Sequence, residues 1–136
     1  MTEIIFTNPA KFETWLVSLE EPQTTLVRFG IEFLLSNQSN FGNRSKWLKP
    51  LNEGLWQLRI GLTVGHAMNF FELQSPLQLT KKKILIRVFY HLLAPDRFLV
   101  LSGYDKQLDP SRERQQSEIR AAKQYLEVWI NEGEVF

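Results

Sequence analysis

The 136-residue sequence contains no cysteine, only two histidines and seven glycines. Without cysteine the chain can form neither a disulfide nor a thiolate zinc site. Its glycines form no G-x-G-x-x-G or Walker pattern, and no G-x-S-x-G motif is present, so these phosphate-loop and hydrolase signatures are excluded. His66 and His91 lie 25 residues apart with no carboxylate at ligand-like spacing. The sequence therefore predicts neither a metal site nor a cofactor.

Long hydrophobic runs are also missing. No apolar stretch approaches the roughly 18 residues that a membrane span requires. The N-terminal segment has an early acidic residue and no long apolar block, unlike a secretory signal. The hydrophobic content of 43% and charged content of 23% are typical of a globular protein. We expect one cytoplasmic domain over residues 1–136, large enough to bury a continuous core.

The net charge of +1 hides an uneven distribution. Residues 81–125 contain 10 basic and 5 acidic side chains, whereas residues 1–80 contain 6 basic and 7 acidic ones. The last eleven residues contain 3 acidic side chains and no basic one. A local basic excess favours contact with phosphates. A solvated charged surface would give the same distribution, so charge alone does not decide the function.

Helical periodicity marks both ends of the chain. Asn8-Pro9 combines a cap residue with a proline at the first helical position, which predicts a helix over 9–20. A second helix is expected from 21 to about 35, and the two suggest a helical hairpin. Asp109-Pro110 repeats the cap signal before a C-terminal helix. The expected buried stripes are Leu26, Phe29, Phe33 and Leu34 in the second helix, and Ile119, Ala122, Leu126 and Trp129 in the last.

Period-2 alternation predicts strands between these helices. A short strand opens the chain at 3–7, and three more are expected at 54–62, 83–94 and 97–102, the last two antiparallel. Residues 36–45 are a polar loop, and 63–83 fits a hairpin arm, a short helix or a mobile loop. The order β-α-α-β-β-β-α predicts an α+β fold in which a small antiparallel sheet packs on the N-terminal helical hairpin.

Two arginines lie mid-strand on the face expected to be open. Arg59 shares its face with Gln57, and Arg87 shares its face with His91, in each case opposite an apolar set. Guanidinium groups on neighbouring strands suit phosphodiester binding and the extra charge of a phosphoryl-transfer transition state. An ion pair with a carboxylate at the sheet rim is the alternative for each arginine.

Other candidates lie near the strand ends. Tyr104 and Lys106 fall in the expected loop 103–110, where a lysine could reach the same surface and a tyrosine could stack on a base. His91 is a candidate general acid or base, whereas its neighbour Tyr90 should be core. Lys81, Lys82 and Lys83 form a basic patch that either contacts phosphates or keeps an arm soluble.

Three ordered segments, "LNEGLWQLRI", "ILIRVFY" and "RFLVLSGYDKQLDPSRERQQSEIRAAKQYL", resemble the phage-derived HigB branch of the RelE-like toxin superfamily. That branch shows a G-L-(aromatic)-E-L-R strand, an R-(hydrophobic)-x-Y strand, and L-x-x-G-(aromatic)-x-K-K running into P-x-x-E-I-x-x-A. The sequence departs from it in the insert 63–83, in Gln107 where a second lysine is expected, and in its lower basic charge.

The resemblance implies a small antiparallel sheet with helices on one side and a basic concave face on the other. It implies the toxin of a type II toxin–antitoxin pair, an endoribonuclease that cuts messenger RNA on the ribosome by metal-independent attack of a ribose 2′-hydroxyl. The expected partner is a helix-turn-helix antitoxin protein. The implied catalytic residues are Arg59, Arg87, Lys106 and, more weakly, Tyr104; the further candidates for RNA contact are Gln57, His91, Lys81, Lys82 and Lys83.

The same residues also allow a second interpretation. The chain could be a non-catalytic, phage-derived RelE-like interaction protein that binds an antitoxin-type partner or itself, as a homodimer. Convergence of Arg59, Arg87 and Lys106 on one open face would favour the nuclease, and dispersal of the three into salt bridges would favour the interaction protein.

Overall fold

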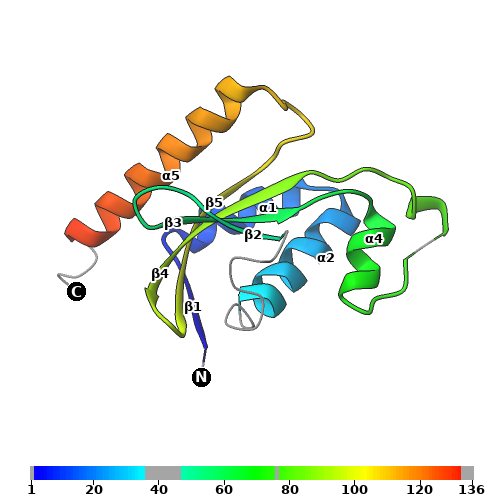
Figure 1. Cartoon of the computed structure of the whole chain (residues 1–136), viewed down its shortest axis with the longest axis horizontal. Helices are drawn as coiled ribbons and strands as arrows, with labels where there is room; N and C mark the ends of the chain where they lie inside the picture. The colour runs from blue at the N-terminus through cyan, green and yellow to red at the C-terminus, as the bar shows by residue number, and fades with distance from the viewer. Residues whose placement is uncertain (1, 36–46, 76, 133–136) are drawn as a thin grey trace.

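The structure is a computed structural model that describes residues 2–35, 47–75 and 77–132 (Figure 1). It has an α+β fold with one five-stranded sheet in the order β1-β5-β4-β3-β2. The strands are β1 (Glu3–Phe6), β2 (Leu48–Pro50), β3 (Leu55–Ile60), β4 (Ile86–Ala94) and β5 (Arg97–Asp105). The polar loop predicted at 36–45 lies outside the described residues.

The sheet is mixed, so the prediction of a wholly antiparallel sheet is wrong at one edge. β1 pairs with β5 in parallel, in a register that places Glu3 opposite Arg97. The other neighbouring strands are antiparallel, including β4 and β5, as predicted. The sequence of β1 could not indicate its direction, because β1 pairs with a strand more than 90 residues away. A parallel pair requires a long connection, which the intervening helices and strands provide.

Four α-helices accompany the sheet in the described residues. They are α1 (Pro9–Ser18), α2 (Glu21–Phe29), α4 (Val64–Phe70) and α5 (Arg112–Glu132), with a π-helical segment η1 (Gly30–Leu35) after α2 and a 3₁₀ turn η3 (Leu77–Leu79). Asn8 caps α1 as predicted, because its side chain accepts the Lys11 N–H at 3.1 Å. Ser111 rather than Asp109 caps α5, since the Ser111 hydroxyl accepts the Arg114 N–H at 3.1 Å.

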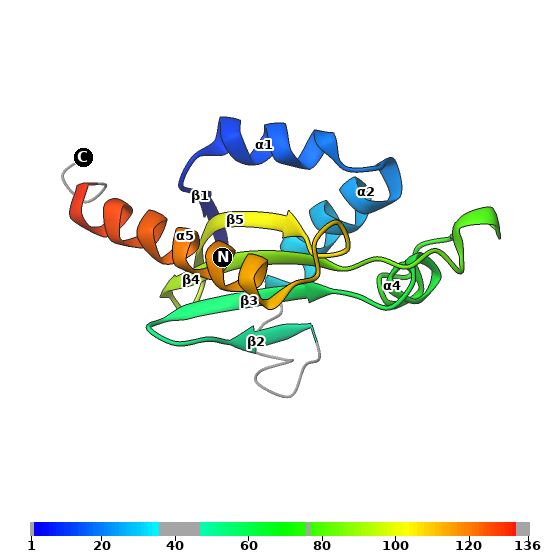
Figure 2. The same cartoon turned by 90° about the horizontal axis from the view of Figure 1, so that it is seen from above.

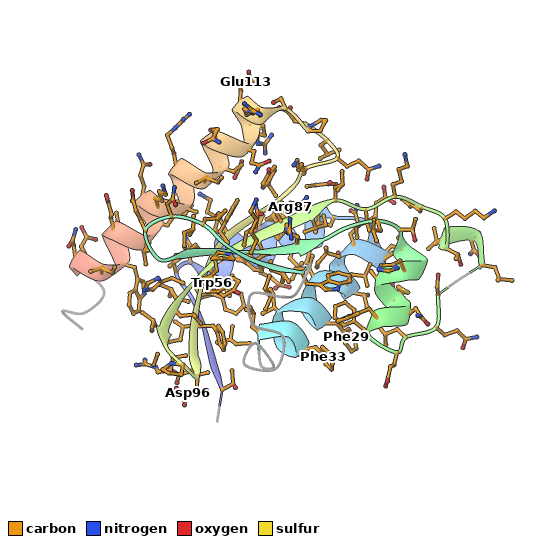
Figure 3. The ribbon with its side chains drawn as sticks, in the orientation of Figure 1. Phe29, Phe33, Trp56, Arg87, Asp96 and Glu113 are labelled. Carbon is orange, nitrogen blue, oxygen red and sulfur yellow. The ribbon has the colours of Figure 1, made fainter. Side chains whose placement is uncertain are left out.

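One face of the sheet packs against α1, α2 and η1. The side chains that form this core from the helices are Phe12, Leu16, Leu26, Val27, Ile31 and Leu35. Phe29 and Phe33, predicted to be buried, are 42% and 43% exposed. They lie between α2 and α4 and contact Phe71 with ring centroids 6.4 and 5.9 Å apart (Figure 3). Leu26 is buried as predicted, but Val27, Ile31 and Leu35 complete the buried stripe in place of the two phenylalanines; the Leu34 side chain lies outside the description.

The close approach of α1 to β5 requires a glycine. A Cβ atom at Gly103 would lie 2.5 Å from two ring atoms of Trp15. That separation is shorter than real carbon contacts, so glycine at this position allows the Trp15 ring to approach the strand this closely. Gly103 matches the glycine of the HigB-type segment, and in this chain its packing against Trp15 accounts for it.

The opposite face, which was expected to be the open one, is partly covered by α5 (Figure 2). Ala122 and Leu126 of α5 are buried against strand side chains, with Ile119 and Trp129 at the margin, so the predicted stripe is confirmed. The strand residues beneath α5 are Leu55, Phe89, Leu99, Leu101 and Tyr104. Toward α4 the same face is less covered, since Leu85 and Arg87 are only partly buried.

The insert 63–83 combines an extended arm with a short helix. The arm continues the β3–β4 hairpin through a bridge between Thr63 and Lys83. The Thr63 side chain then caps α4 by accepting the His66 N–H at 3.1 Å. Phe71 packs α4 against Phe29 of α2, so the insert is part of the folded domain. No helix in the described part of the chain is long and apolar enough to cross a membrane.

Candidate functional site

The two predicted arginines lie directly opposite one another on neighbouring strands. The β3–β4 register pairs Arg59 with Arg87, and the β4–β5 register pairs Arg87 with Tyr104. Directly opposed residues on antiparallel strands have Cβ atoms about 4.5–5.5 Å apart and point to the same face. The row continues toward β2, since the Arg59 N–H donates to the Trp47 carbonyl at 2.6 Å.

Like charges in this position are unfavourable unless something compensates them. Among the residues that the structure describes, no carboxylate forms an ion pair with Arg59 or Arg87. Burial lowers the pKa of the Arg87 guanidinium, and the charge of Arg59 lowers this pKa further. The Arg87 Nη1 donates to the Ile86 carbonyl at 3.1 Å, which leaves the other donors of its fork available.

Lys106 joins the arginines just beyond the end of β5. Its N–H donates to the Leu85 carbonyl at 2.8 Å, so the lysine continues the strand pairing past Arg87. Burial lowers the pKa of Lys106, and the charges of Arg87, Lys49 and Arg59 lower this pKa further, in that order. The three predicted cations therefore belong to one electrostatic cluster. We call Arg59, Arg87, Lys106 and Lys49 the basic cluster.

Lys49 was missed by the sequence analysis. It lies in the short strand β2, where the register pairs it with Gln57 of β3. A three-residue strand is too short to show a period, so nothing in the sequence alone linked Lys49 to Arg59. Only the pairing of β2 with β3 brings it to this face.

Several buried polar atoms on the same face lack a partner. In the described part of the chain, side-chain atoms without a hydrogen-bond partner are Gln57 Nε2, Arg59 Nε, Ser102 Oγ and Tyr104 OH. Gln57 and Ser102 both lie opposite Phe89, one step along the strands from the arginine pair. Unsatisfied buried donors are rare in folded proteins and mark strain or a binding role. Here they cluster beside the arginines.

Tyr104 does not occupy a loop, which corrects the prediction. It lies in β5 and is only 2% exposed. Its ring stacks on Phe89 at a centroid distance of 6.1 Å and an angle of 8°, and the Arg114 guanidinium lies 5.5 Å from the ring centroid. This burial leaves no face for a base to stack on. Burial also raises the pKa of the Tyr104 phenol, so the phenol is protonated at neutral pH.

We expect Tyr104→Phe to raise the free energy of unfolding by about 1 kcal/mol, because the substitution removes a buried hydroxyl that has no partner. Urea denaturation measures the change. Tyr125→Phe is the control: it removes a hydroxyl at an exposed contact with Lys11 Nζ, 2.7 Å away, and should change stability by less than about 0.5 kcal/mol. A loss above about 1 kcal/mol in Tyr104→Phe would contradict the expectation.

Of the candidates for RNA contact, Gln57 lies opposite Lys49 of the basic cluster but is only 2% exposed, and the others lie away from the cluster. His91 lies four residues along β4 from Arg87, about 13 Å away at the usual strand rise. Its Nδ1–H donates to the Gly54 carbonyl at 2.7 Å. Lys82 forms an ion pair with Glu20 at the start of α2, whereas Lys81 and Lys83 are exposed on the arm. His91 is thus too far from Arg87 to act as its acid or base partner.

Two pockets flank this region. The pocket beside the arginines has a volume of about 440 Å³ and is lined by Trp47, Arg59, Gly61, Leu62, His66, Leu85 and Arg87. A larger pocket of about 650 Å³ lies between α1 and α5, with mainly apolar and aromatic walls. Among its described lining residues the one cation is Lys11, which already contacts Tyr125. The smaller pocket is therefore the better site for an anion.

Comparison with known proteins adds no assignment: no protein-family model matches the chain, and no curated protein matches it in sequence.

Proposed function

We propose that the basic cluster binds the phosphodiester backbone of RNA, and that the protein is a ribosome-dependent mRNA endoribonuclease, the toxin of a type II toxin–antitoxin pair. The observation that carries the proposal is the direct pairing of Arg59 with Arg87, neither of which forms an ion pair with a carboxylate of the described residues. Like charges held together in a folded sheet lower its stability, and a bound phosphate would offset that repulsion. The HigB-type resemblance supplies the reaction.

The proposed reaction needs charge stabilisation and one proton acceptor. The ribose 2′-oxygen attacks the adjacent phosphorus, the bond to the 5′-oxygen breaks, and the products are a 2′,3′-cyclic phosphate and a 5′-hydroxyl. Arg59 and Arg87 stabilise the charge that develops on the phosphoryl oxygens. Lys106 adds a third positive charge beside the phosphoryl oxygens, while water accepts the proton of the 2′-hydroxyl and protonates the leaving 5′-oxygen.

Tyr104 has a different role in this proposal from the one implied by the resemblance. Its hydroxyl is buried, so it does not contact the substrate. Its ring packs between Phe89 and Arg114 and lies opposite Arg87. Tyr104 is therefore a positioning residue that supports the strand carrying Arg87 into the site.

A second candidate is the non-catalytic interaction protein that binds an antitoxin-type partner or itself. The pocket of about 650 Å³ between α1 and α5 favours it, because Trp15, Tyr125 and Trp129 line a cleft of the size and apolar character that binding sites use. In a toxin the same cleft would be compatible with an inhibitory partner. A small helix-turn-helix protein encoded directly downstream would fit both readings, so the two differ only in catalysis.

Induced expression separates the candidates. Inducing the protein is expected to arrest translation and leave transcripts cut at codon-linked positions, and Arg59→Ala should relieve both effects. Arg28→Ala is the matched control, since Arg28 lies on α2 in an exposed ion pair with Glu13. Normal growth and intact transcripts during strong expression of soluble protein would count against the nuclease.

A further inference from the structure

The pocket beside the arginines is lined by two kinds of side chain. Arg59 and Arg87 are its cations, and Trp47 and His66 are its aromatic pair, around a volume of about 440 Å³. Leu62 and Leu85 add apolar surface, and Gly61 contributes no side chain. This combination of cations, flat rings and apolar surface differs from the basic cluster alone, which would attract phosphate without contacting a base.

The two aromatic residues of the pocket come from separate parts of the chain. Trp47 lies next to Arg59 in the sheet through the backbone hydrogen bond of 2.6 Å. His66 comes from α4, within the insert 63–83. The two rings are parallel within 9°, with centroids 6.3 Å apart. Phe70 and Phe71 contact the Trp47 ring at 4.8 and 5.8 Å, so the insert holds both members of the pair in place.

We propose that this pocket binds the nucleobase adjacent to the phosphate held by Arg59 and Arg87, with the exposed His66 ring as the stacking surface and the buried Trp47 ring behind it. The inference rests on the proposed function and names a base subsite within it. A base and its phosphate are joined through one ribose, so their binding groups must lie in one pocket, as these four side chains do. Aromatic stacking accepts every base, because each has a flat π face.

The inference assigns a role to the insert. Without α4 the basic cluster would lie at an open end of the sheet, and only the backbone charge of RNA would be recognised. α4 lies beyond the end of β3 and the beginning of β4 (Figure 2), and its His66 side chain forms part of the pocket wall. The insert therefore makes the site selective for unpaired nucleotides, whose bases are free to enter, over duplex RNA, whose bases are stacked.

The test uses a short, non-cleavable 2′-O-methyl RNA and a series of the same RNA in which one base at a time is removed. For the wild-type protein, one abasic position should weaken binding about 5- to 100-fold, the effect of losing one stacked base. His66→Ala and Gly61→Leu should bind the intact RNA more weakly and lose most of this abasic penalty. His66→Phe should retain the penalty, because phenylalanine preserves the stacking surface.

Asn69→Ala is the matched control, since Asn69 is exposed on the same helix and does not line the pocket. Arg87→Ala should weaken binding of intact and abasic RNA alike and keep the penalty. An equal abasic penalty in wild type, His66→Ala and Gly61→Leu would overturn the base pocket while leaving the RNA-binding face intact. No salt-dependent binding of the intact RNA by the wild-type protein would instead overturn the proposed function.

Discussion

Replacing Arg87 by alanine is expected to reduce RNA cleavage about 10²- to 10³-fold, the usual effect of removing one group that stabilises transition-state charge. Arg87 is central to the basic cluster because it lies between Arg59 on β3 and Tyr104 on β5. Its loss removes the fork of donors best placed to contact two phosphoryl oxygens at once. The change is measured by incubating the protein with messenger RNA on translating ribosomes and mapping the cut ends.

The same substitution should leave stability within about 1 kcal/mol of wild type, because it also removes repulsion from Arg59. A large fall in cleavage together with unfolding would therefore not support the proposal. Arg87→Lys keeps the charge without the fork and should recover only part of the activity. Arg97→Ala is the control, since Arg97 pairs with Glu3 at the far edge of the sheet. Equal cleavage by Arg87→Ala and wild type would exclude Arg87 from the reaction.

Binding offers an independent measurement on the same variant. A lysine or arginine that neutralises one phosphate of a single strand contributes about 0.7 to the slope of log affinity against log salt. Arg87→Ala should reduce that slope by about this amount, whereas Arg97→Ala should leave it unchanged. A weaker affinity with an unchanged slope would indicate that Arg87 acts through the fold and not through a phosphate.

Replacing Phe89 by alanine is expected to lower the free energy of unfolding by about 3–5 kcal/mol, the range for large aromatic truncations in a core. Phe89 is fully buried although it lies on the same face of β4 as Arg87. It stacks on Tyr104 and belongs to the cluster that α5 covers. The loss of stability would therefore combine the lost burial of the ring, the cavity that it leaves, and weaker packing of α5.

Urea denaturation with coincident fluorescence and circular dichroism probes measures this loss. Leu77→Ala is the control, because Leu77 is 92% exposed and its truncation should change stability by less than about 0.5 kcal/mol. If Phe89→Ala cost less than about 1 kcal/mol, α5 would not be packed on this face. The face would then be more open than the structure shows.

The local elements of this protein were largely predictable. The Asn8-Pro9 signal predicts the start of α1 because a side-chain cap and a fixed proline φ act within a few residues. Alternation places Arg59 and Arg87 on one face of their strands because side-chain direction has a strict period of two. Both signals are local, so tertiary context did not change them.

Errors arose where burial depends on a distant partner. Phe29 of α2 and Phe33 of η1 are large apolar residues, yet they lie toward α4, whose position no pattern in the first 35 residues could indicate. Tyr104 follows a glycine and precedes polar residues, which is typical of a loop. It is instead part of β5 because β4 offers pairing partners as far as Asp105.

The sequence by itself determined the α+β class, the strand positions of the two arginines and the apolar stripe of α5, since each follows from spacing along a single element. Tertiary structure decided what surrounds them. It paired Arg59 with Arg87, added Lys49 from β2, buried Tyr104 beneath α5, and placed His66 of the insert beside Trp47. These contacts join residues remote in sequence, and only strand register and helix docking bring such residues together.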